Sequence, residues 1–132
     1  EGMKGAAATA GMLSAAILLA PGCERRPEPR NSKEEPVRRA AYLSVLAREL
    51  LDSCPAGGVP AGEATRYGEL TRLAVQTGAG HAIWLGENDA AAVSRVSPAT
   101  RCGTGDAARQ AALAAYSRSL DTLAGRIAEY RP

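Results

Sequence analysis

Residues 106–131, DAARQAALAAYSRSLDTLAGRIAEYR, decide the fold of this chain. The large apolar residues of this stretch recur at alternating steps of three and four, which places them in one stripe along one face of a helix. They are Leu113, Tyr116, Leu120, Leu123, Ile127 and Tyr130. A long apolar stripe must be covered by other helices or by a partner protein. The stretch therefore predicts an all-α fold, a small bundle of about four helices.

Three further helices are expected upstream of this stretch. Ser32 and Glu35 have the spacing of a capping box at the start of the first, over residues 34–54. Residues at helical spacing predict its inward face: Val37, Ala40, Leu43, Leu46, Ala47, Leu50 and Cys54. The second is expected over residues 63–77 and the third over 82–96, with a possible interruption at Gly86 because glycine weakens a helix.

The composition bounds the size and the partners of the molecule. A length of 132 residues allows one domain, and 16 basic against 14 acidic residues give a net charge of +2. The charges form no long block of one sign, so we expect no nucleic-acid partner. With no Phe, one Trp and four Tyr, the core must consist mainly of leucine and small residues.

The amino-terminal segment has the pattern of a secretory signal. Residues 5–22 follow Lys4 and carry no charge. They are also just long enough to cross a bilayer, so an uncleaved anchor is an alternative. We therefore divide the chain into a signal peptide or anchor over residues 1–22, a charged, proline-containing tether over 23–33, and a helical domain over 34–132.

The end of the apolar segment, Leu18-Leu19-Ala20-Pro21-Gly22-Cys23, resembles the lipobox of bacterial lipoprotein precursors. The resemblance implies that Cys23 is lipidated, becomes the first mature residue and holds the chain at a membrane of the bacterial envelope, on its periplasmic side. Glu24 stands where aspartate would favour retention at the inner membrane, so the outer membrane is favoured. Simple secretion and the uncleaved anchor stay open as alternatives.

Three cysteines are an odd number for an exported protein. If Cys23 is lipidated, as the resemblance implies, Cys54 and Cys102 can pair in an oxidising compartment and link the first and last helices. Two free, buried thiols are the alternative. A metal site is not expected, since the chain has no Cys-x-x-Cys pair and its one histidine is distant.

Candidate site residues are few. His81 and Trp84 are read as a helix-start histidine with a core-facing tryptophan. If two of Trp84, Tyr116 and Tyr130 were exposed, these aromatic residues would form a partner-binding face. Glu87 and Asp89 are weighed as an acid pair and set aside. We predict no catalytic, cofactor-binding or metal-binding residues.

The functional hypothesis is an exported, membrane-tethered helical domain that acts as a non-enzymatic interaction or structural module of the envelope. The membrane contact runs through lipidated Cys23 or the amino-terminal apolar segment, and a protein partner is expected. One alternative is an accessory subunit of a membrane complex, held by an uncleaved helix. Another is a small periplasmic chaperone or inhibitor. The chain is similar to small helical acid chaperones of the envelope only in having two distant cysteines.

Overall fold

A computed structural model describes residues 32–55, 57–97 and 101–131. Within these ranges the chain forms a short 3-10 helix, η2 (Ser32–Glu34), followed by α1 (Glu35–Asp52), α2 (Ala61–Gln76), α3 (Gly80–Val96) and α4 (Asp106–Glu129), with no strand. The predicted all-α fold with four α-helices is therefore confirmed for the described part of the chain. Cys23 lies outside the described residues.

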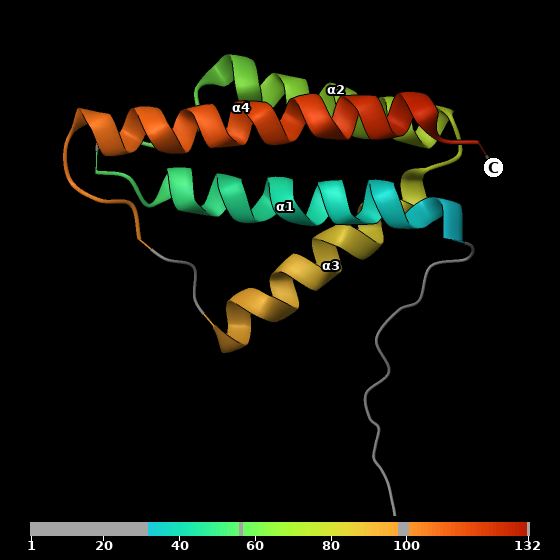
Figure 1. Cartoon of the computed structure of the whole chain (residues 1–132), viewed down its shortest axis with the longest axis horizontal. Coiled ribbons are helices and arrows are strands. Elements are labelled where there is room, and N and C mark those ends of the chain that lie inside the picture. The colour runs from blue at the N-terminus through green and yellow to red at the C-terminus, as the bar shows by residue number, and fades with distance from the viewer. Residues whose placement is uncertain (1–31, 56, 98–100, 132) are drawn as a thin grey trace, which may run out of the picture.

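The helix α1 lies at the centre of the arrangement. It packs on both α3 and α4, whereas α2 makes smaller contacts with α3 and α4. Figure 1 shows α1 and α4 side by side and antiparallel, while α3 crosses α1 at a slant. The amino end of α1 and the carboxyl end of α4 consequently meet at the same end of the molecule.

The core is built on the predicted stripe of α4. Tyr116, Leu120, Leu123, Ile127 and Tyr130 are buried, and Leu113 packs against them partly buried. The other helices contribute mostly small side chains, and these allow close helix packing. The small ones are Val37, Ala40, Ala41, Ala74 and Ala82, and the larger ones are Leu51, Tyr67, Leu70 and Ile83.

The inward face of α1 differs from the expected one. Ala41 and Ser44 are fully buried, whereas Leu43 is 44% exposed. The Ser44 hydroxyl donates to the Ser119 carbonyl of α4 at 3.4 Å, so a small polar residue fits where the two backbones approach. The capping box is also not formed, because Glu34 is the N-cap residue of α1 and makes no side-chain cap.

The helix α3 continues through Gly86 without the expected interruption. Gly86 is buried against α1. A Cβ atom at this position would lie 2.8 Å from the Ala41 Cβ and 2.9 Å from the Tyr42 backbone nitrogen, and would also collide with the Arg38 carbonyl. The glycine is therefore required by the close approach of two helices.

A disulfide joins Cys54 to Cys102, as predicted, with 4.8 Å between their Cα atoms. It connects the turn after α1 to the segment before α4, so the helices themselves are not linked. The Ser53 hydroxyl also connects these two segments. It accepts a hydrogen bond from the Cys102 amide at 2.8 Å and donates one to the Leu50 carbonyl at 2.6 Å. In the described ranges, no helix has the length and apolar character needed to cross a membrane.

Candidate functional site

An aromatic pair lies on the surface of α3. Trp84 is 50% exposed, which corrects the expectation that it faces the core. Its ring stacks on that of His81, with 5.8 Å between the ring centroids and 26° between the planes. Since a half-exposed tryptophan offers a large, rigid apolar face, this pair can contact another molecule.

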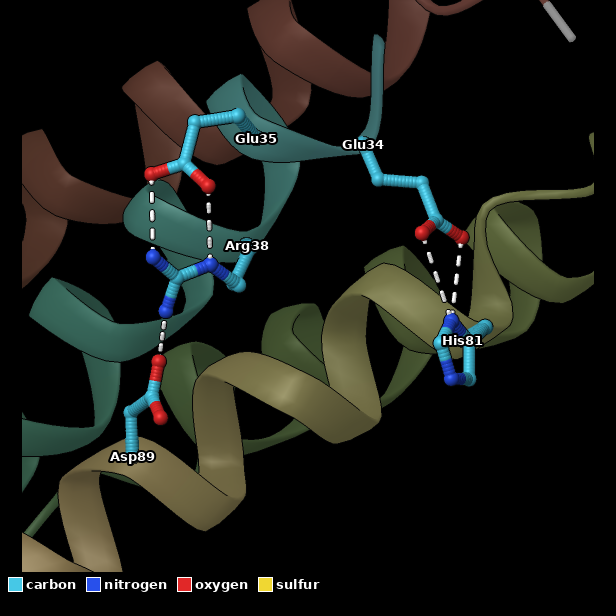
Figure 2. Close-up of polar contacts among 5 residues, drawn as sticks. All are labelled: Glu34, Glu35, Arg38, His81 and Asp89. Carbon is cyan, nitrogen blue, oxygen red and sulfur yellow. Dashed lines mark hydrogen bonds and ion pairs between the residues drawn. The ribbon is translucent and has the colours of Figure 1, made fainter. Parts of the chain in front are cut away.

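The His81 ring contacts a buried carboxylate. Glu34 is 2% exposed, and its two oxygens lie 3.1 and 3.3 Å from the His81 Nδ1 atom. Figure 2 shows Glu34 reaching from the start of α1 to His81 at the start of α3. The contact fixes the histidine ring and, through stacking, the ring of Trp84.

The other two aromatic residues of the predicted partner face are in the core. Tyr116 is fully buried and Tyr130 is 7% exposed. Both belong to the α4 stripe that the remaining helices cover. The condition for a partner-binding face of Trp84, Tyr116 and Tyr130, exposure of two of them, is therefore not met, and of the three only Trp84 reaches the surface.

The two carboxylates weighed as an acid pair hold helices together. Glu87 accepts a hydrogen bond of 2.6 Å from the Tyr67 hydroxyl of α2. Asp89 accepts from Arg38, whose guanidinium also binds both oxygens of Glu35 at 2.9 and 3.0 Å. Figure 2 shows this chain of charges crossing from α1 to α3.

Two tyrosines have perturbed acidity. Burial, followed by the hydrogen bond to Glu87, raises the pKa of Tyr67 well above its ordinary value. Burial also raises the pKa of Tyr116, while the nearby Arg48 guanidinium opposes the shift. Arg48 lies over the Tyr67 ring, 5.4 Å from its centroid. In both tyrosines the shift favours the neutral phenol.

A groove of about 500 Å³ runs between α1 and α4. Its apolar residues are Pro36, Ala40 and Leu43 of α1, and each helix adds one arginine, Arg39 and Arg126. The lining is completed by Glu35, Thr122 and Glu129. Sequence reasoning missed this groove because helical spacing assigned Leu43 to the inward face of α1, whereas Leu43 is exposed.

Among the described residues, no group of three or more His, Cys, Asp or Glu side chains could hold a metal ion. The chain matches no protein-family model, no curated protein and no solved structure. A functional proposal must therefore come from the chemistry of its own residues.

Proposed function

We propose that this chain is an exported, membrane-tethered helical domain, a non-enzymatic interaction module of the bacterial envelope. The protein has two functional parts in this view, a membrane tether and a partner-binding domain. Residues 5–22 and Cys23 deliver and hold the chain, and the helical domain presents a surface to a protein partner. Each part is supported by a separate observation.

The pairing of cysteines is the observation that carries the proposal. The sequence contains three cysteines, and the Cys54–Cys102 disulfide uses two of them. A stable structural disulfide is typical of oxidising compartments such as the periplasm. The remaining cysteine, Cys23, directly follows the apolar segment, where the lipobox resemblance places the lipidated residue.

The polar contacts support a binding role over a catalytic one. Each titratable residue that sequence reasoning considered for chemistry holds two parts of the fold together: Glu87 binds Tyr67, Asp89 binds Arg38, and His81 binds Glu34. The large side chain left at the surface beside them is Trp84, a residue type enriched at the energetic centres of interfaces.

Intact mass spectrometry of the protein from its native membranes tests the tether. We expect a mass that starts at Cys23, carries a diacylglyceryl group and lacks two hydrogens for the disulfide. A soluble, unlipidated product would contradict the tether. A mass that retains residues 5–22 would favour an accessory subunit with an uncleaved anchor.

Photo-crosslinking in intact cells tests the partner surface. A photoreactive amino acid replaces Trp84, and a second variant carries it at Arg118, which is exposed on α4. We expect a discrete cross-linked protein from position 84 that is missing from position 118. Equal or absent products from both positions would contradict a partner surface at Trp84.

A further inference from the structure

The groove between α1 and α4 combines an apolar surface with two arginines, Arg39 and Arg126. Leu43, nearly half exposed, and Pro36 supply the apolar contact. Glu35 is bound by Arg38, outside the groove lining. Arg126 forms an ion pair of 3.1 Å with Glu129, and because both side chains are exposed the pair is weak, so a phosphate can compete with Glu129 for Arg126. Arg39 forms no ion pair with any described residue.

A second groove continues the first toward the end of the bundle. It shares Pro36, Arg126 and Glu129 with the first and adds Lys33 and Arg131. Among the described residues, the Arg131 guanidinium donates to two neutral carbonyls, those of Ala128 at 3.1 Å and Tyr130 at 2.9 Å, and forms no ion pair. Four basic and two acidic side chains line the two grooves together.

This surface lies where the amino-terminal segment joins the bundle. The grooves gather around the first turns of α1 and the last turn of α4, which meet at one end of the molecule (Figure 1). Nine residue steps separate Cys23 from Ser32, and a fully extended chain of that length reaches at most about 30 Å. A domain tethered at Cys23 therefore keeps these grooves close to the membrane.

We propose that the α1–α4 groove docks on the membrane surface and takes an anionic phospholipid. The lipid phosphate binds Arg39 and Arg126, and the part of the acyl chain nearest the headgroup contacts Leu43 and Pro36. The charge fits, because anionic membrane surfaces attract basic side chains. This inference rests on the proposed tether, which keeps this end of the bundle within reach of the membrane.

Quenching of a single tryptophan by brominated lipid reports the docking. The lipidated protein is reconstituted into vesicles through Cys23, and the paired changes Leu43→Trp and Trp84→Phe move the only tryptophan into the groove. Circular dichroism and the disulfide mass verify the fold. We expect brominated phosphatidylglycerol to quench this variant strongly, and the unaltered chain, whose Trp84 lies on α3, weakly.

Charge variants in the same background test the lipid headgroup contact. Arg39→Gln and Arg126→Gln should each lower the ratio of docked to undocked chain roughly fivefold, the effect of one basic residue at an anionic surface. The matched control Arg118→Gln removes an exposed arginine of α4 outside the grooves and should leave quenching unchanged. Added salt should weaken quenching, since it screens the attraction.

Three outcomes would overturn the inference. Equal quenching in phosphatidylcholine would show that anionic lipid is not recognised, and no quenching of a chain that floats with the vesicles would show that the groove faces water. Fluorescence of the Leu43→Trp variant that changes with protein concentration without lipid would assign the groove to a second copy.

Failure of the tether is scored separately. Flotation with phosphatidylcholine vesicles, which carry no net charge, reports membrane insertion of the lipid on Cys23 alone. If the chain does not float but is still quenched by brominated phosphatidylglycerol, the result supports docking by the groove and contradicts the tether.

Discussion

Tyr67 and Tyr116 place two phenolic hydroxyls inside the bundle in different surroundings. The Tyr67 hydroxyl donates to Glu87, whereas the Tyr116 hydroxyl is buried and forms no hydrogen bond with the described residues. A buried polar group without a partner reduces stability, because it has lost its hydrogen bonds to water.

Replacing each tyrosine by phenylalanine should separate these two cases. Tyr116→Phe should leave the free energy of unfolding unchanged or raise it, while Tyr67→Phe should lower it by about 1 kcal/mol through loss of the hydrogen bond. Urea denaturation measures both. A larger loss for Tyr116→Phe than for Tyr67→Phe would contradict this account.

The same two residues predict how stability depends on pH. Their pKa values are raised in the folded state, so the folded protein holds these protons where the unfolded chain, with pKa values near 10.0, releases them. The stabilisation is complete below pH 10.0 and is lost as the pH rises above that value. Urea titrations on both sides of this pH should show the decline, and Tyr67→Phe should reduce its slope. An equal slope in this variant would exclude Tyr67 as a source.

Single residues also show what the sequence alone could not indicate. The sequence predicts a core-facing Trp84 one turn after a histidine at the start of a helix, but the Trp84 ring instead stacks on His81 at the surface. The Glu34–His81 contact spans 47 residues of sequence, and no local pattern marks it. Such pairings arise from the tertiary structure and are visible only there.

At the level of the helices, the contact of α1 with α3 depends on Gly86. Gly86→Ala should lower the free energy of unfolding by about 1–3 kcal/mol, since the added methyl group forces two packed backbones apart. Thermal and urea denaturation measure the loss. The result is informative because alanine by itself favours a helix over glycine.

Gly125 supplies the matched control within α4. A Cβ atom at Gly125 would meet nothing within 4 Å. Gly125→Ala should therefore raise the free energy of unfolding by about 0.5–1 kcal/mol, the gain in helix propensity. A loss of similar size in both variants would refute the assignment of the Gly86 effect to helix contact.

The helices differ in how well their sequence predicts them. The α4 stripe was predicted correctly because large apolar residues mark one face without ambiguity. The inward face of α1 was predicted only in part, since Ala41 and Ser44 are small and the exposed Leu43 is a stronger hydrophobic signal. In a core built on small residues, hydrophobicity identifies a helix more reliably than it identifies the buried face.

At the level of the whole molecule, stability should depend on the disulfide. Closing a loop between residues 48 apart restricts the unfolded chain and is worth about 4 kcal/mol by the chain-entropy estimate. Reduction, or the paired change Cys54→Ser and Cys102→Ser, should lower the free energy of unfolding by about that amount. Urea denaturation with and without reductant measures it. Equal midpoints would contradict a stabilising role.

The disulfide could be predicted without geometry, because the lipobox resemblance assigns Cys23 to lipidation and leaves Cys54 and Cys102 to pair. The surface features could not be predicted in this way, because they depend on how the helices pack. The α1–α4 groove combines residues such as Leu43 and Arg126 that lie far apart in the sequence, and their proximity follows from the antiparallel packing of two helices.

The Cys54–Cys102 disulfide also changes the covalent topology. Residues 54–102 form a closed ring that contains α2 and α3, and α1 and α4 leave it as two tails. A protease that cuts once within the ring opens it but produces no separate fragment. The chain thereby keeps all four helices on one covalent framework after a single nick within the ring.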